Sequence, residues 1–151
     1  MIELSDDIEL RPLRPLGPGP TPARSEVWLA GRPTRTLVSG CVLQAALRCT
    51  PGWLLFATDD APAEEMLSIH LLGADMTLRD SALIGGAYST GSFAQLRLES
   101  PDRAHFRFID GAAWTVQVWD RPRLAIPFLP DARGVWRGAR LRRHFEVRRQ
   151  P

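Results

Sequence analysis

Histidine is the side chain best suited to general acid–base chemistry near neutral pH, and the chain contains three, His70, His105 and His144. None has a carboxylate and a nucleophile at a recognisable catalytic spacing, and no two are separated by the two or four residues that bring both imidazoles to one metal ion. His70 and His105 alternate with apolar residues, which predicts that both lie on solvated faces of strands. A hydrolase or isomerase would therefore need distant strands to converge, with His70, His105, Asp59 and Glu64 as candidates.

A second group of reactive side chains is the acidic loop of residues 59–65, whose carboxylates belong to Asp59, Asp60, Glu64 and Glu65. Carboxylate oxygens bind hard cations such as Ca²⁺. Calcium loops alternate their ligands and have a glycine at the sharp bend, whereas this loop has Ala-Pro-Ala at residues 61–63. We therefore predict a solvated loop, and we expect neither a metal nor another cofactor.

Residues 85–92 combine three glycines with the only tyrosine of the chain. Glycine allows close backbone approach to a ligand, and hydroxyl groups donate and accept hydrogen bonds. Tyr88, Ser89 and Thr90 are therefore candidate ligand-binding residues, at the mouth of a cavity for a small apolar ligand. A plain connection between strands is the simpler interpretation. The segment is no phosphate-binding loop, because that loop needs a lysine and all 19 basic residues of the chain are arginines.

Two cysteines, Cys41 and Cys49, lie within residues 36–49, whose apolar residues recur at even spacing and predict one strand. At the rise of a strand they would be about 26 Å apart, far beyond the reach of a disulfide. We expect two separate thiols that pack as small buried hydrophobic side chains.

Tryptophan and arginine are enriched at binding hot spots, and the chain has five tryptophans. Trp114 alternates with expected core positions, whereas Trp119 has the opposite parity and is expected at the surface, as is Trp136. Arginines stand close to both, so the candidate partner-binding residues are Trp119, Arg121, Arg123, Trp136 and Arg137. Packing of these tryptophans at the ends of the core is the alternative interpretation.

The charges are distributed unevenly along the chain. Residues 61–120 hold four arginines and eight acidic residues, whereas residues 121–151 hold nine arginines and two acidic residues. A basic end suggests nucleic-acid binding, but single-stranded nucleic acid also needs aromatic platforms, and only Trp136 and Phe145 stand nearby. We expect a solvated basic face on the last strand and no binding of nucleic acid.

Strands bounded by turn residues must position all of these side chains. The stretches expected as strands are 27–30, 36–49, 53–58, 67–72, 76–84, 94–99, 104–109, 113–118, 121–128 and 142–148. Two hairpin turns are the clearest signals, a proline-led turn at residues 100–103 and Asp110-Gly111. Prolines restrict residues 121–128 to an edge or bulged strand.

This pattern predicts an all-β fold, a single antiparallel sandwich or up-and-down barrel built from a meander of short strands. Residues 1–25 are expected to form an N-terminal arm, since residues 11–25 hold five prolines, and residues 26–151 a single β domain. Ile2, Leu4, Ile8 and Leu10 can supply a short edge strand.

For function, we expect a non-catalytic β domain that binds a protein partner or forms an oligomer. A β-barrel that binds a small ligand is the first alternative, and a small hydrolase or isomerase the second. No apolar run approaches the roughly 20 residues of a membrane-spanning helix, and the acidic N-terminus does not resemble a secretory signal, so we expect a cytoplasmic protein.

Overall fold

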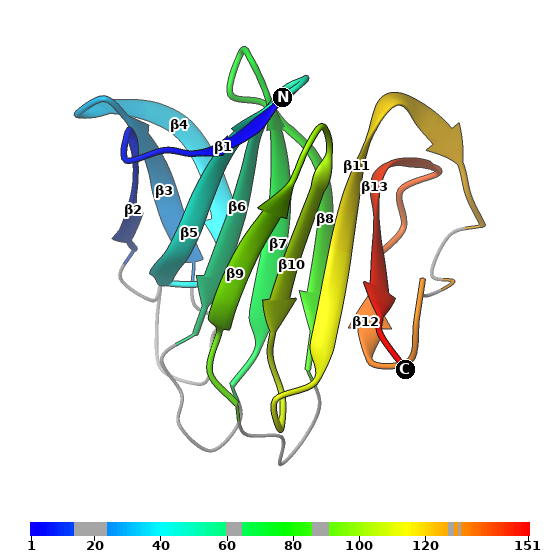
Figure 1. The fold of residues 1–151 in the computed structure, drawn as a ribbon. Helices are drawn as coiled ribbons and strands as arrows, with labels where there is room; N and C mark the ends of the chain where they lie inside the picture. Colours follow the sequence, from blue (N-terminus) through cyan, green and yellow to red (C-terminus); the bar gives the residue numbers. More distant parts are fainter. Residues whose placement is uncertain (14–23, 60–64, 86–90, 127–128, 130) are drawn as a thin grey trace.

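The computed structural model describes residues 1–13, 24–59, 65–85, 91–126, 129 and 131–151 (Figure 1). In these ranges the chain forms strands and no helix, and the strands build three antiparallel sheets. The predicted all-β fold is therefore confirmed. The sheets stack as a sandwich and do not close, so the barrel alternative is wrong.

The central sheet has six strands in the order β1-β5-β6-β7-β8-β12. Their bounds are β1 Ile2–Leu4, β5 Val42–Cys49, β6 Gly52–Thr58, β7 Leu67–Gly73, β8 Leu78–Ile84 and β12 Val135–Trp136. β5 to β8 follow one another along the chain as an antiparallel meander, and the N-terminal β1 pairs with β5 along one edge. The other edge is the short β12, which pairs with β8.

A four-stranded sheet covers one face of the central sheet, and we call it the front sheet because it faces the viewer in Figure 1. It consists of β9 Ala94–Glu99, β10 Arg103–Arg107, β11 Ala113–Leu124 and β13 Arg142–Arg149, in the order β13-β11-β10-β9. The larger core lies between these two sheets. Phe56, Phe93 and Phe106 meet there with ring centroids 5.2–5.3 Å apart, which are favourable separations for aromatic pairs.

A three-stranded sheet, which we call the back sheet, covers part of the opposite face. It consists of β2 Ile8–Pro12, β3 Arg24–Leu29 and β4 Arg32–Ser39. Its apolar residues form a second core with Trp53, Leu55 and Leu72 of the central sheet. Because both faces of the central sheet are covered, every residue of β6 and β7 is buried.

Because the back sheet covers this face, the expectation for His70 is wrong. Its alternation with apolar residues predicted a solvated face, but His70 is 2% exposed. Alternating polarity shows which face of a strand is apolar, and it does not show whether another sheet covers the polar face. Here the back sheet does so, and Ser68, which lies on the same face of β7 as His70, is 1% exposed.

The expectation of a single strand over residues 36–49 is also wrong. The chain turns at Gly40 and passes from β4 in the back sheet to β5 in the central sheet. Gly40 has a φ of +99°, and a Cβ atom at this position would lie 2.7 Å from the Cβ of Ala57. Glycine is required by both the conformation and the contact, so a single glycine marks a change of sheet.

The two predicted hairpins are confirmed. β9 and β10 are joined through residues 100–102, and β10 and β11 through a turn in which Ile109, Asp110 and Gly111 have positive φ. Alternation along these strands predicts six inward-facing residues, and all are buried: Ala104, Phe106, Phe108, Trp114, Val116 and Val118. β11 continues to Leu124 past a shift of register between Val118 and Arg123, so residues 121–124 of the predicted strand form the bulged end of β11. Residues 125 and 126 are not part of a strand, and residues 127 and 128 lie outside the described residues.

The N-terminal residues supply an edge strand to each of two sheets, since β1 pairs with β5 in the central sheet and β2 pairs with β3 in the back sheet. The short edge strand expected from Ile2, Leu4, Ile8 and Leu10 is thus present as two strands. Residues 14–23, which hold most of the predicted proline-rich arm, lie outside the described residues.

Candidate partner-binding surface

The most exposed large apolar side chains belong mainly to one stretch of chain, residues 124–141, which runs from the end of β11 to the start of β13. We call it the connecting segment. Its exposed side chains are Leu124 (83%), Ile126 (68%), Leu129 (57%), Trp136 (65%) and Leu141 (59%). β11 bends away from the front sheet before this segment begins (Figure 1). Exposed apolar side chains in one segment indicate an interaction surface more strongly than scattered ones.

Backbone hydrogen bonds hold several of these residues close together. The N–H of Ala125 donates to the carbonyl of Leu141 at 2.8 Å, and Leu124 is paired with Arg142 across the strands. The N–H of Leu129 donates to the carbonyl of Ile126 at 3.3 Å. Leu124, Ile126 and Leu141 therefore lie around the junction of β11 and β13.

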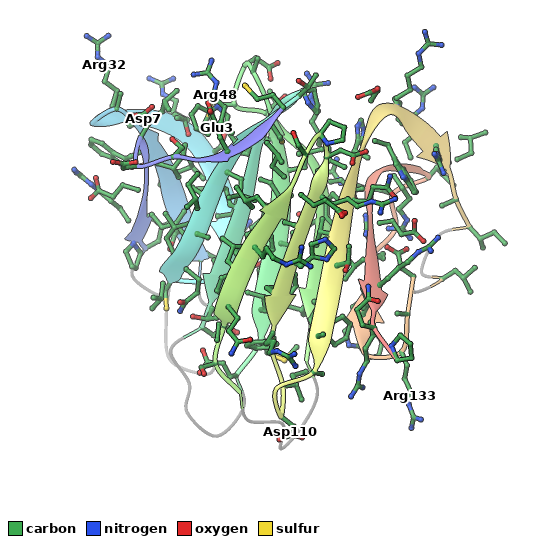
Figure 2. The ribbon with its side chains drawn as sticks, viewed as in Figure 1. Glu3, Asp7, Arg32, Arg48, Asp110 and Arg133 are labelled. Carbon is green, nitrogen blue, oxygen red and sulfur yellow. The ribbon has the colours of Figure 1, made fainter. Side chains whose placement is uncertain are left out.

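Five exposed arginines accompany the apolar residues: Arg121, Arg123, Arg133, Arg140 and Arg142. Among the described residues 120–142 the carboxylates are Asp120, which is exposed, and Asp131, which is bound internally. Arg123 stacks over the ring of Trp119, with its guanidinium carbon 4.1 Å from the ring centroid. Figure 2 shows Arg133 extending outward from the molecule. The surface is apolar and positively charged.

An open hollow of about 550 Å³ adjoins the start of β13. Its lining comes from the start of β8 with the residue before it, from the end of the connecting segment and from the start of β13: Thr77, Leu78, Arg79, Ala139, Arg140, Leu141, Arg142 and His144. Arg140 donates to the carbonyl of Arg79 at 3.0 Å, which ties the two walls together. The pKa of His144 is lowered chiefly by its partial burial, with Arg79, Arg140 and Arg142 contributing and Asp80 opposing. The hollow is therefore another positively charged part of this surface.

A buried ion cluster fixes the connecting segment to both sheets. The Arg137 side chain is fully buried and donates to Asp80 of β8 at 2.6 Å and to Asp131 at 2.7 Å. Its guanidinium carbon lies 4.2 Å from the ring centroid of Phe145. Burial lowers the pKa of Arg137, and the carboxylates of Asp80 and Asp131 oppose this shift. Charge-assisted hydrogen bonds of this length are among the strongest in proteins.

The carboxylates of the same cluster also satisfy backbone groups of β13. Asp80 accepts from the N–H of His144 at 2.7 Å, and Asp131 accepts from the N–H of Val147 at 2.9 Å. Buried Arg143 donates to the carbonyls of Arg137 and Leu129. These contacts anchor Leu129, Asp131 and Arg137 of the connecting segment to β8 and β13. Residues 127, 128 and 130 of the segment lie outside the described residues.

The structure separates the five residues predicted to bind a partner. Trp136, Arg121 and Arg123 are exposed, and Trp119 is half-buried beneath Arg123. The expected surface position is wrong for Arg137, which is 4% exposed and holds the ion cluster together.

Sequence reasoning missed the leucine and isoleucine residues that dominate the surface, namely Leu124, Ile126, Leu129 and Leu141. A signal existed for the first three. Residues 121–130 place apolar side chains between prolines and arginines, a pattern that cannot supply a covered central strand. Such a segment leaves some of its apolar side chains uncovered.

The candidate catalytic residues that the structure describes, His70, His105 and Asp59, do not form one site. His70 accepts or donates at Ser81 Oγ (2.8 Å) and contacts the carbonyl of Ser39 at 2.9 Å, and burial lowers its pKa to about 4. A neutral, enclosed imidazole of this kind forms hydrogen bonds between strands in the interior and has no access to substrate. Asp59 lies elsewhere, with its pKa raised by burial and by the nearby Glu65 carboxylate.

His105 lies on the outer face of the front sheet, between an acid and a hydroxyl group. Its Nδ1 is 2.8 Å from Thr115 Oγ1, and its Nε2 is 3.6 Å from Glu99 Oε2. The carboxylate distance is longer than a hydrogen bond. Thr115 Oγ1 also accepts from the side-chain amide of Gln150 at 2.7 Å, so this hydroxyl is engaged in a polar network.

Several further expectations concern residues 60–64 and 86–90, including Asp60, Glu64, Tyr88, Ser89 and Thr90, and these lie outside the described residues. Among the residues that are described, no three His, Cys, Asp or Glu side chains group as metal ligands would. No disulfide joins Cys41 and Cys49, which stand on opposite ends of β5; Cys49 is buried, as expected, and Cys41 is half-buried.

Comparison of the chain with family models, with curated proteins and with solved structures found no match. The described part of the chain also contains no helix of the length and apolarity that crossing a membrane requires. The surface is therefore interpreted from its own residues.

Proposed function

We propose that this protein is a non-catalytic β domain that binds a protein partner through the connecting segment. One observation carries the proposal. Five large apolar side chains, 57–83% exposed, belong to a segment that a buried ion cluster anchors through Asp131 and Arg137. Fully burying one leucine or isoleucine contributes about 1.5–3 kcal/mol, so two or three of them are enough to anchor a complex.

The charges around the segment favour a particular partner chemistry. Five exposed arginines surround the apolar residues, and an acidic contact surface would pair with them. If this surface paired with the same surface of a second copy of the chain, arginines would face arginines, and this repulsion opposes self-association. The partner we propose therefore presents apolar side chains flanked by carboxylates.

Site-specific photo-crosslinking in the cells that naturally make the protein tests this proposal. A benzophenone side chain replaces Leu124 or Trp136 in the full chain, and the matched control replaces Leu37, which is 40% exposed on β4 of the back sheet. We expect one discrete heterologous adduct from the first two positions and none from the control.

Charge reversal supplies the second arm. The double variant Arg121→Glu/Arg123→Glu should lose most of the adduct, whereas Arg32→Glu, at the opposite end of the molecule from Arg133 (Figure 2), should keep it. The proposal is overturned if all three positions label the same set of proteins, or if the only adduct is with a second copy of the chain.

A further inference from the structure

The outer face of the front sheet carries polar side chains in three rows that cross the four strands. Strand pairing aligns the first two rows as Glu99, Arg103, Gln117 and Glu146, then Arg97, His105, Thr115 and Arg148. The third row contains Arg107, Ala113 and Gln150. This face is turned toward the viewer in Figure 2, and it is separate from the connecting segment.

Two adjoining hollows open on this face on either side of His105. The first, of about 300 Å³, is lined by Gln95, Arg97, His105, Phe106, Arg107, Ala113, Trp114 and Gln150. The second, of about 260 Å³, is lined by Glu99, Arg103, His105, Thr115, Gln117, Glu146, Arg148 and Gln150. Together they approach the size of sites that bind small molecules.

The first hollow has uncompensated positive charge. No residue that lines it carries a carboxylate, and among the described residues neither Arg97 nor Arg107 forms an ion pair. The arginines of the second hollow differ in this respect, since Arg103 lies 3.7 Å from Glu99 and Arg148 lies 2.6 Å from Glu146. Two guanidinium groups without an acid are suited to bind an oxyanion.

A bulge in β9 positions one of these guanidinium groups. The register between β9 and β10 shifts between His105 and Arg107, and Gln95 has a φ of +55°, an uncommon conformation for a residue other than glycine. As a result Gln95 Oε1 accepts from Arg107 Nε at 2.9 Å, and Arg107 Nη1 donates to the carbonyl of Gly111 at 2.7 Å. Arg107 is held in one orientation, which lowers the entropy cost of binding an anion.

The second hollow has the complementary chemistry. Glu99 and Glu146 are acceptors for hydroxyl groups, and the side-chain amides of Gln117 and Gln150 both donate and accept. His105 separates the two hollows, with Nδ1 directed to Thr115 and Nε2 buried without a hydrogen-bond partner among the described groups. The face thus offers oxyanion donors on one side and hydroxyl acceptors on the other.

From this arrangement we infer that the outer face of the front sheet binds a small anionic sugar. Its phosphate or carboxylate group lies between Arg97 and Arg107, and its hydroxyl groups face Glu99 and Glu146. The inference does not depend on the proposed partner surface, because no residue lines both.

A titration of the full chain tests this inference. The probes are glucose 6-phosphate, glucuronate, inorganic phosphate and glucose, and binding is measured by calorimetry and by the NMR resonances of the histidine imidazoles. We expect at least one of the two anionic sugars to bind more tightly than inorganic phosphate and glucose, and to shift the His105 resonances while those of buried His70 stay in place. The tighter of the two identifies the anionic group.

Arg97→Ala should weaken this binding at least tenfold, the loss expected for a hydrogen bond to a charged group. Arg32→Ala on β4 is the control and should leave it unchanged. About 10 mM is the weakest affinity that such contacts should give, so the inference is overturned if no probe binds at that concentration. It is also overturned if both variants weaken binding equally, or if inorganic phosphate binds as tightly as the sugars.

Discussion

His70 makes the stability of this protein depend on pH in a way that can be worked out from its surroundings. The imidazole is 2% exposed between the central and back sheets, and burial lowers its pKa from 6.5 to about 4. The hydrogen bond to the Ser39 carbonyl partly opposes this shift. The folded protein therefore keeps His70 neutral at pH values where the unfolded chain binds a proton.

The sign and size of the effect follow from linkage. Between pH 6.5 and pH 4 the unfolded state binds more protons than the folded state, so the free energy of unfolding falls as the pH falls. The full difference corresponds to about 3 kcal/mol, of which about 2 kcal/mol is lost between pH 7 and pH 5. This is a large share of the stability of a typical domain.

Urea unfolding at pH 7 and pH 5, followed by tryptophan fluorescence, measures the effect in wild type and in His70→Gln. The variant should be less stable at pH 7 but lose about 2 kcal/mol less than wild type on acidification, because glutamine does not titrate. Ser25→Ala, which removes a buried hydrogen bond to the Gly40 carbonyl and leaves the partners of His70 in place, is the control and should keep the wild-type pH dependence. If wild type and His70→Gln lose the same free energy between the two pH values, the reasoning about His70 is refuted.

The other predictions concern the ion cluster and the change of sheet. Asp80→Asn should lower the free energy of unfolding by about 3–5 kcal/mol, because Arg137 is then left as a buried charge with Asp131 as its single carboxylate partner. Denaturant unfolding measures this loss. A loss below about 1 kcal/mol, the value of an exposed ion pair, would contradict the prediction. Gly40→Ala should destabilise by more than about 1 kcal/mol, since alanine is strained at a φ of +99° and its Cβ would meet Ala57; unchanged thermal unfolding would show that the turn relaxes.

Local signals in the sequence were sufficient for the strands and hairpins. Alternation placed Phe106, Trp114 and Val116 in the core, and Asp110-Gly111 marked its turn, because both depend on neighbouring residues only. The third layer could not be predicted in the same way. The polar residues Ser68 and His70 are covered by the back sheet through contacts with residues about 30 positions away, and no local pattern encodes such pairing.

The candidate surface was predicted in part for a similar reason. Parity predicted a surface position for Trp119, which is half-buried, and the neighbouring arginines suggested one for Trp136, which is exposed, as are Arg121 and Arg123. Arg137 differs because its partners, Asp80 and Asp131, come from different parts of the chain. The exposure of Leu124 and Ile126 depends on where β11 leaves the front sheet, which follows a shift of register between Val118 and Arg123.

The affinity of the crosslinked partner for purified variants tests the central proposal most directly. The double variant Leu124→Ser/Ile126→Ser is compared with Leu37→Ser/Val42→Ser, which changes exposed apolar residues away from the connecting segment. We predict that the first pair weakens binding about 100-fold or more, since each buried aliphatic side chain contributes about 1.5–3 kcal/mol, and that the second pair has no effect. Equal affinity of the two double variants would contradict the account.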